Sequence, residues 1–344
     1  MNYEHGGNIY NYDHILDFSA NINPLGMPSK VKEAVINSAY LWDKYPDSEC
    51  RELRKILSES ENISFQNIVI GNGADDIIYR IVHAFKPKKA IICTPTFSEY
   101  EKALKEIDCT VDRYFLREEQ NFCAAEDILE KLAPDTDILF LCSPNNPTGQ
   151  LAAPDLLKKI SLKCAENNII FVCDECFMGF AENYEVYSLK WYMNRNSIIL
   201  KAFTKLYAMP GLRLGYALCG SDSIAAKLWN SGQFWSVSVP ALAAGTAAVK
   251  EKEYVCRTID FIKKERKFLM SGLKKYGIKV FPSAVNFLLF KTWKGLDDKL
   301  ISNGILIRNC ANYQGLCEGF YRIAVRTHEE NEVLLSAVGR CMNG

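Results

Sequence analysis

Short apolar runs alternate with amphipathic segments along most of the chain. The runs are rich in β-branched residues and apolar throughout, as expected of strands that are buried on both faces. They predict strands at residues 68–70, 90–93, 137–142, 169–173, 197–202 and 214–219. The segments between them have helical periodicity and predict helices at 75–85, 98–106, 154–167 and 222–229. This order of elements predicts an α/β fold, in which helices sandwich a mostly parallel sheet.

The pattern changes after Pro240. A long charged stretch at 241–276 is predicted to be helical, and strands are expected at 279–281 and 287–291. Further short pieces at 306–308 and 321–326 precede a last helix that starts at residue 329. We therefore expect an arm at 1–30 that contributes to the substrate site, a large domain at 31–245 and a small α+β domain at 246–344.

The overall charge excludes several classes of partner. The 344 residues include 41 Lys+Arg and 41 Asp+Glu, so no net field directs the chain to nucleic acid or to a membrane surface. No apolar stretch approaches the roughly 20 residues that a membrane helix needs. The first 13 residues lack the basic region and the apolar run of a signal peptide. We expect a cytoplasmic protein whose affinity for anions depends on locally placed cations.

The 13 cysteines are scattered singly through apolar segments, which favours reduced, buried thiols over disulfides. The one C-x-x-C pair, Cys173 and Cys176, encloses Asp174 and Glu175 and has no second pair or histidine beside it. No metal site is predicted from this spacing.

Five polar clusters fall where predicted strands end. They are GNGADD (71–76), TPTFSEY (94–100), SPNNPTG (143–149), the pair Asp174–Glu175 and the pair Thr204–Lys205. Any one of them could be an ordinary loop: GNGADD reads equally well as a turn with an aspartate cap, and SPNNPTG as a Pro-Asn turn. In an open α/β sheet, however, ligands bind outside the carboxyl ends of the strands, and all five clusters belong to that edge.

One ligand accounts for all five clusters. A phosphate suits the glycine-rich helix start and Arg213, and a protonated ring nitrogen suits Asp174, whose charge needs a partner if buried. A flat ring suits Phe97, a phenolic oxygen suits Asn146, and an aldehyde suits Lys205. Pyridoxal phosphate carries each of these groups.

The pairs D-E and T-K, the SPNNPTG segment and the arginine after P-G-x resemble the signature of fold-type-I pyridoxal-phosphate enzymes. The resemblance is to the aminotransferase class that includes histidinol-phosphate aminotransferases, and it spans almost the whole chain. It implies that Lys205 forms the Schiff base, Asp174 pairs with the ring nitrogen, Asn146 binds the phenolic oxygen and Phe97 stacks on the ring. It also implies the groups that hold the cofactor phosphate: the backbone of Ala74 and Asp75, with Thr204 and Arg213.

Two further positions follow from the same resemblance. Tyr45, in KYPD, matches a tyrosine that reaches the phosphate from a second subunit, which implies a homodimer. Phe177 is a departure, because the aminotransferases carry tyrosine at this position and bind the phenolic oxygen with it. The pKa and absorbance of the bound cofactor are therefore expected to differ from theirs.

Four segments narrow the reaction. HGGN (5–8), DFSANINPLG (17–26), IRNCANYQGL (307–316) and YRIAVR (321–326) resemble those of threonine-phosphate decarboxylases of the cobalamin pathway. This resemblance implies that His5, Ala20, Asn21 and Arg308 hold the substrate phosphate. Arg322 would fork onto the α-carboxylate, and Asn146 would border the substrate as well. His5 could also be a structural histidine and Arg308 a surface residue, whereas an arginine between apolar neighbours, like Arg322, needs an anion.

Three hypotheses remain at this point. The first is decarboxylation of O-phospho-L-threonine to (R)-1-amino-2-propanol O-phosphate, with O-phospho-L-serine as an additional or replacement substrate that yields ethanolamine phosphate. The second is a histidinol-phosphate-type aminotransferase. The third is a catalytically silent binding module, which the presence of both Lys205 and Asp174 disfavours. Phosphothreonine and phosphoserine differ by one methyl group, and a methyl is worth only about 1–3 kcal/mol of discrimination.

Overall fold

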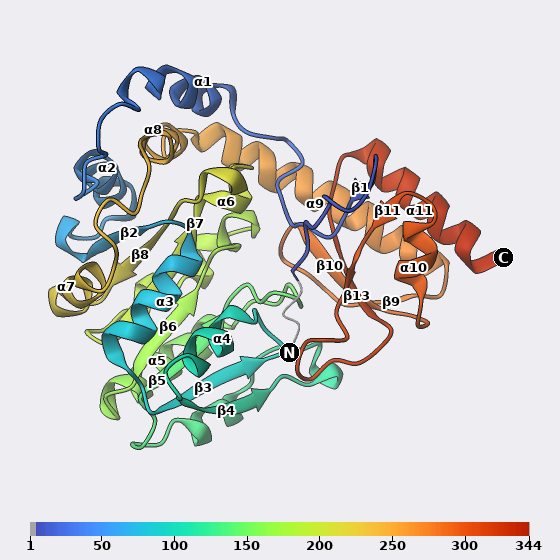
Figure 1. Ribbon diagram of the computed structural model, residues 1–344. Coiled ribbons are helices and arrows are strands. Elements are labelled where there is room, and N and C mark those ends of the chain that lie inside the picture. The colour runs from blue at the N-terminus through green and yellow to red at the C-terminus, as the bar shows by residue number, and fades with distance from the viewer. Residues whose placement is uncertain (1–4, 344) are drawn as a thin grey trace.

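The computed structural model describes residues 5–343, and a seven-stranded sheet forms the centre of its larger part (Figure 1). Residues 1–4 of the predicted arm and residue 344 of the predicted small domain lie outside this range. In spatial order the strands are β2 (Ile68–Gly71), β8 (Gly215–Cys219), β7 (Ser197–Ala202), β6 (Ile170–Asp174), β5 (Ile138–Cys142), β3 (Lys89–Thr94) and β4 (Thr110–Phe115). Only β8 runs antiparallel to its neighbours, so the predicted mostly parallel sheet is confirmed.

Alternate residues of these strands belong to two separate apolar layers, because side chains in a strand point to opposite faces. On one face Ile92, Phe140 and Leu200 pack under three helices, α3 (Ala74–Phe85), α4 (Glu99–Lys105) and α7 (Asp222–Asn230). On the other face Ile91, Leu139 and Ile199 pack under α2 (Arg51–Glu61), α5 (Pro154–Glu166) and α8 (Val239–Ala248). The sheet is therefore covered on both sides, as its continuous apolar strands require.

A smaller sheet forms a second core beside the first (Figure 1). Its antiparallel strands are β12 (Arg308–Asn309), β13 (Phe320–Ala324), β10 (Phe287–Lys291) and β9 (Lys279–Val280). It packs with α9 (Lys252–Lys275), α10 (Leu296–Ile301) and α11 (His328–Asn343). The strand β1 (Leu16–Asp17) pairs in parallel with β11 (Ile305–Leu306), which brings the N-terminal segment into this smaller part. The core also includes Phe18 and Phe177, so the two parts share a packed boundary.

Several predicted elements differ from the observed ones. The stretch 241–276 is two helices, α8 and α9, which are separated at residues 249–251. The piece 306–308 is divided at Ile307 between β11 and β12, which belong to different sheets. Strand β4 and the helices α1 (Ser29–Asn37), α2 and α10 were not predicted, and neither was the short helix α6 (Phe203–Leu206) that carries Lys205. No described helix is both long and apolar enough to cross a membrane.

A buried charge cluster ties α2 to the sheet. Glu61, the last residue of α2, accepts hydrogen bonds from Lys201 Nζ (2.9 Å) on β7, Lys190 Nζ (3.3 Å) and Tyr216 OH (2.6 Å) on β8. Burial alone would raise the pKa of Glu61, but the charge of Lys201 and the bonds from Tyr216 and Lys201 outweigh it and hold this pKa at about 2.

We expect Glu61→Gln to destabilise the fold by about 3 kcal/mol at pH 7. This value follows from the difference between the pKa of Glu61 in the folded protein, about 2, and its ordinary pKa of 4.5. Because the unfolded chain takes up the proton first, this stabilisation is complete above pH 4.5 and is lost as the pH falls toward 2. Urea unfolding of both proteins between pH 7 and pH 3 measures the difference, which should narrow below pH 4.5. The exposed Glu59→Gln on the same helix is the control and should unfold like the wild type at each pH.

Candidate active site

A cavity of about 430 Å³ lies where the strand ends of the large sheet meet the smaller part. It is bordered by residues that follow β5, β6 and β7, by the start of α3, and by Arg322 of β13. The carboxyl edge of the sheet thus supplies most of its wall, as an open α/β sheet predicts. Its lining includes these predicted site residues: His5, Ala20, Asn21, Ala74, Asp75, Phe97, Asn146, Asp174, Thr204, Lys205, Arg213 and Arg322.

Lys205 projects from the short helix α6, directly after β7. Among the described residues its amine has no hydrogen-bonding or ion-pair partner. Burial lowers the pKa of Lys205, and the neighbouring Arg322 guanidinium lowers it further. A lysine amine that is easily deprotonated is suited to attack a carbonyl carbon.

Asp174 ends β6 and is buried at the cavity wall. Its Oδ2 accepts a hydrogen bond from Tyr100 OH (2.5 Å) and its Oδ1 accepts one from the Cys176 backbone N–H (2.9 Å). Burial raises the pKa of Asp174, while the bonds from Cys176 and Tyr100 oppose the rise. A cationic group of a ligand placed against this carboxylate would favour its ionised form.

Tyr100 was not predicted as a site residue, although it stands in the TPTFSEY segment that was singled out. Its ring is fully buried, stacks on Phe140 with centroids 5.1 Å apart, and meets Phe97 edge-on at 5.7 Å. Tyr100 therefore braces both the carboxylate of Asp174 and the ring of Phe97.

We expect Tyr100→Phe to weaken pyridoxal-phosphate binding about 10- to 100-fold. The variant keeps the stacked ring but removes a hydrogen bond to a charged group, which is worth about 1.5–3 kcal/mol. Fluorescence titration of the cofactor-free protein gives the Kd. Tyr254→Phe removes a similarly buried hydroxyl, which donates to Gly26 O (2.6 Å); neither residue borders the cavity, and the Kd of this variant should match the wild type. An unchanged Kd in Tyr100→Phe would show that Asp174 needs no support from this hydroxyl.

The start of α3 forms a cradle for an anion. No side chain caps this helix, so its first backbone N–H groups have no side-chain acceptor. Gly73 precedes it at φ +89°, and a Cβ there would lie 2.6 Å from Arg213 Nη2. Arg213 itself has φ +53° and donates to Asp75 Oδ2 (2.9 Å). The hydroxyl of Thr204 borders the same cavity and has no hydrogen-bond partner among the described residues.

Arg322 joins the small sheet to the cavity. Its guanidinium donates to Asn146 Oδ1 through Nη1 and to the Ser19 carbonyl oxygen through Nη2 (2.7 Å). Its Nε is buried without a partner, as is Oδ1 of Asn21. Because Asn146 uses its oxygen on Arg322, its amide N–H groups remain to donate to a ligand.

Three predicted residues are placed differently from this group. His5 borders the cavity but is bonded through Nε2 to Glu99 Oε1 (2.8 Å). Arg308 does not line it; it borders an adjacent cavity of about 180 Å³ that shares Phe97 and Tyr313. Tyr45 lies outside both cavities, is 77% exposed and stacks on Trp235 with centroids 4.2 Å apart.

Phe177 borders the cavity and packs edge-on against Phe287 of the small sheet, with centroids 5.0 Å apart. Its ring thus offers the cavity an apolar edge where a tyrosine would have offered a hydroxyl. Cys176 lines the cavity as well, and burial raises its pKa well above the ordinary value, with Asp174 adding to the rise. Within residues 5–343, no three His, Cys, Asp or Glu side chains are grouped to hold a metal.

These residues fit pyridoxal phosphate. The uncapped helix start with Arg213 suits its phosphate, the buried carboxylate of Asp174 suits its ring nitrogen, and the partnerless amine of Lys205 suits its aldehyde. Asn146 and Phe97 would complete the set at the phenolic oxygen and the ring face. The cavity volume is within the range of cofactor sites, about 300–1,000 Å³.

The chain matches the family described as "Aminotransferase class I and II" over residues 13–338. It is 37% identical to a threonine-phosphate decarboxylase of Salmonella typhimurium, covering 100% of this chain and 98% of the relative. It is 31% identical to an adenosylcobalamin biosynthesis bifunctional protein of Leptospira interrogans, covering 99% of this chain and 41% of that protein. The crystal structure of a histidinol-phosphate aminotransferase from Clostridium acetobutylicum superposes with a TM-score of 0.89 at 31% identity, covering 96% and 99% of the two chains.

Proposed function

This chain belongs to the aminotransferase class I and II family of pyridoxal-phosphate enzymes, and on that premise we propose that it decarboxylates O-phospho-L-threonine. The fold and the cofactor predicted from the sequence motifs are thereby confirmed. The product of the proposed reaction is (R)-1-amino-2-propanol O-phosphate, a precursor for cobamide (cobalamin) biosynthesis. The observation that carries the proposal is the full-length similarity to the Salmonella decarboxylase.

Pyridoxal phosphate, when bound, supplies an electron sink for the pair left on Cα when one of its bonds breaks. This chain decides which bond that is by the way it holds the substrate. Arg322 is buried, borders the cavity and has a partnerless Nε, and we propose that it binds the α-carboxylate and fixes its direction.

We propose that the substrate phosphate binds to residues other than Arg322. His5, the Ala20–Asn21 segment and Arg308 are the proposed contacts. His5, Ala20 and Asn21 border the main cavity, and Arg308 reaches it only past Phe97 and Tyr313, which border both cavities. After carbon dioxide leaves, Cα must regain a proton. The Lys205 amine, which also borders the cavity, is the proposed donor, with a bound water as the alternative.

The test is to supply phosphothreonine to the cofactor-loaded protein without any keto acid. We expect one carbon dioxide to be released for each amine formed, through many turnovers, because decarboxylation leaves the cofactor ready for the next substrate. Accumulation of the pyridoxamine form instead would contradict the proposal. Phosphoserine, which would yield ethanolamine phosphate, is compared with phosphothreonine by kcat/KM in the same assay.

A second candidate is an aminotransferase that acts on histidinol phosphate, which the similarity to the Clostridium structure favours. Such an enzyme would stop after one half-reaction with its amino donor, and 2-oxoglutarate would restore the original absorbance. The carbon dioxide assay and this absorbance assay give opposite results for the two candidates. A silent binding module is disfavoured because Lys205 and Asp174 both border the cavity.

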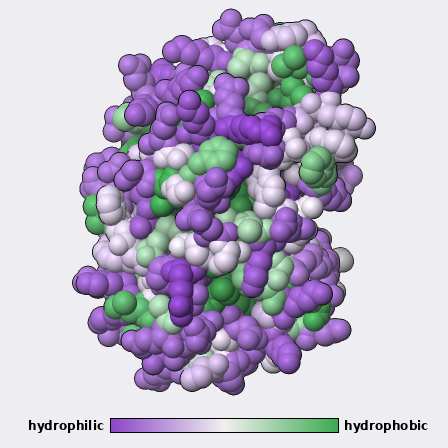
Figure 2. Space-filling view, turned by 90° about the vertical axis from the view of Figure 1, so that its left-hand side faces the viewer, coloured by the Kyte–Doolittle hydropathy of each residue, from purple (hydrophilic) through white to green (hydrophobic). Residues whose placement is uncertain are grey.

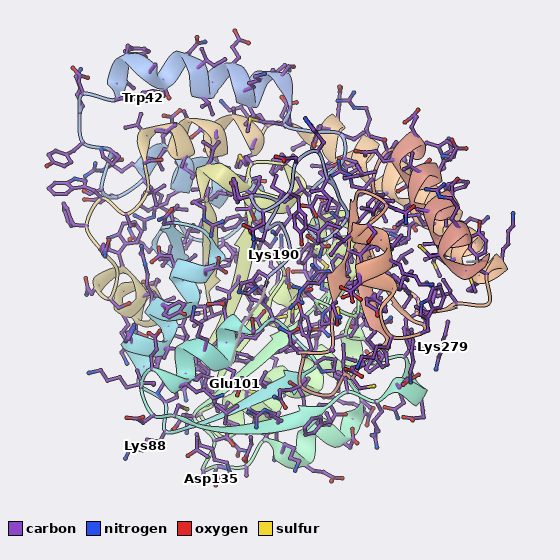
Figure 3. The ribbon with its side chains drawn as sticks, turned by 45° about the vertical axis from the view of Figure 1, so that its right-hand side comes forward. Trp42, Lys88, Glu101, Asp135, Lys190 and Lys279 are labelled. Atoms are coloured by element: carbon purple, nitrogen blue, oxygen red, sulfur yellow. The ribbon has the colours of Figure 1, made fainter. Side chains whose placement is uncertain are left out.

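We also propose that the protein acts as a homodimer, and that Tyr45 reaches the cofactor phosphate of the second subunit. Tyr45 stacks on the exposed Trp235, which contacts the exposed Phe234, and Tyr40 and Trp42 are exposed earlier in the same chain segment. Trp42 lies at the outer edge of the molecule (Figure 3), and hydrophilic residues cover most of the face that carries α2 and α7 (Figure 2).

We keep the division of the chain that the sequence predicts as a proposal: an arm at 1–30, a large domain at 31–245 and a small domain at 246–344. A cytoplasmic location is proposed because all 13 cysteines are unpaired.

A further inference from the structure

Residues 5–7, here called the strap, lie where the main cavity meets solvent. The side chain of His5 is 46% exposed and yet lines the cavity with Gly6. A Cβ on Gly6 would lie 2.1 Å from the Ser19 carbonyl oxygen, so only glycine allows this close approach. The Gly7 N–H donates to Ser19 Oγ (2.7 Å), which in turn donates to Asp17 Oδ1 (2.6 Å). One end of the strap is therefore fixed to Ser19, whose carbonyl oxygen also accepts a hydrogen bond from Arg322.

The other end of the strap is held by Glu99, the first residue of α4, which also borders the cavity. Glu99 is buried, and its Oε1 lies 2.8 Å from His5 Nε2. Its Oε2 accepts hydrogen bonds from Tyr79 OH (3.1 Å) and Lys102 Nζ (3.4 Å). Tyr79, Lys102 and His5 thus surround a carboxylate to which neither the cofactor set nor the substrate set assigns a role.

A carboxylate at the wall of a cavity that binds a phosphate is unfavourable unless other groups pair with it. Here Glu99 is paired with His5 and with Lys102. Because a carboxylate can only accept, the contact with Glu99 places a ring proton of His5 on Nε2. The other ring nitrogen, Nδ1, has no partner among the described residues, and the His5 ring contacts the Phe97 ring with centroids 5.6 Å apart. Lys102 supplies the positive charge that faces the carboxylate of Glu99.

We propose that Glu99 is a positioning residue for the substrate phosphate: it anchors the strap across the cavity and holds the His5 ring at the place where the phosphate binds. Lys102, which also borders the cavity, compensates the charge of Glu99. This inference rests on the proposed function for the identity of the phosphorylated substrate. The binding of a phosphate group at this place, however, does not depend on which bond of the substrate breaks.

The test uses the cofactor-loaded protein, in which the cofactor phosphate already occupies the start of α3, with inorganic phosphate as the probe. In Glu99→Gln we expect the Kd of inorganic phosphate, measured by calorimetry, to rise about tenfold or more, as for loss of a hydrogen bond to a charged group. The KM for phosphothreonine should rise by the same factor, while kcat stays within about threefold. Glu106→Gln, the same change at an exposed position after α4, should leave both constants unchanged.

A double-variant cycle tests whether Glu99 acts through His5. We expect His5→Ala to weaken phosphate binding and the addition of Glu99→Gln to have little further effect, because the pair works as a unit. Hydrogen exchange of the peptide at residues 5–12 should be faster in Glu99→Gln than in the wild type, and the Kd of pyridoxal phosphate should be the same in both. An unchanged phosphate Kd in Glu99→Gln, or fully additive effects in the cycle, would overturn the inference.

The outcome is separable from that of the proposed function. If phosphothreonine yields no carbon dioxide but the phosphate Kd responds to Glu99→Gln, the proposed reaction is wrong and the role of Glu99 stands. If carbon dioxide is released and the phosphate Kd does not respond, the reaction stands and the role of Glu99 is wrong.

Discussion

Lys205→Ala should abolish turnover, with kcat reduced by at least about 10³-fold. Positioned proton transfer alone contributes about 10²–10⁴-fold, and Lys205 is also the amine that holds the cofactor covalently. Decarboxylation of phosphothreonine gives the rate. Borohydride reduction followed by mass spectrometry should find a pyridoxyl group on the peptide that contains residue 205 in the wild type and no such group in the variant.

The control for this loss is Lys227→Ala, at an exposed position on α7. It should keep the wild-type rate and the pyridoxyl group at residue 205. Far-ultraviolet circular dichroism should show both variants folded, since the side-chain amine of Lys205 has no hydrogen-bond partner among the described residues and its backbone bonds are kept in the variant. Substantial activity in Lys205→Ala, or a pyridoxyl group on another lysine, would contradict the assignment.

Arg322→Ala should lower kcat/KM for phosphothreonine about 10²–10³-fold. Truncating one partner of a buried, hydrogen-bonded charge pair costs about 2–5 kcal/mol, and each 1.4 kcal/mol is a factor of ten. The variant also leaves Asn146 Oδ1 and the Ser19 carbonyl oxygen without their donor. Because the carboxylate is then held less firmly, we expect an increase in the fraction of turnovers that end in the pyridoxamine form.

One further variant separates charge from geometry at this position, and a variant at another position is the control. Arg322→Lys keeps the charge but loses the planar fork, and it should recover only part of the activity. Arg340→Ala removes an exposed arginine on α11 and should behave like the wild type. If Arg322→Ala retained a wild-type KM and kcat, the substrate carboxylate would have to bind elsewhere in the cavity.

The sheet and the cofactor set could be predicted because each depends on local sequence. Strands such as β5 are apolar at every position, and the polar groups that follow them necessarily meet at one edge. Strand β4 was missed because TVDRYF carries exposed and charged residues, as an edge strand does. The break between α8 and α9 was missed because residues 249–251 (VKE) include no glycine or proline, so packing rather than local preference ends the helix there.

The supporting residues of the site could not be predicted in the same way. The bond between Tyr100 and Asp174 joins residues 74 positions apart, and that between His5 and Glu99 joins residues 94 apart. Neither pair has a spacing motif, since contact depends on how α4 docks on the sheet and on where the strap crosses the cavity. The placement of Arg308 in the adjacent cavity likewise depends on the division of one predicted strand between two sheets.

The position of β8 between β2 and β7 has a consequence for biosynthesis. Among the described strands, β2 pairs only with β8. The pair can form only after Gly215, the partner of Gly71, has been synthesised. At about 5–20 residues per second, this delay is roughly 7–30 s on the ribosome. During that time the residues of β2, all buried in the finished sheet, have to be shielded within the nascent chain or by a chaperone.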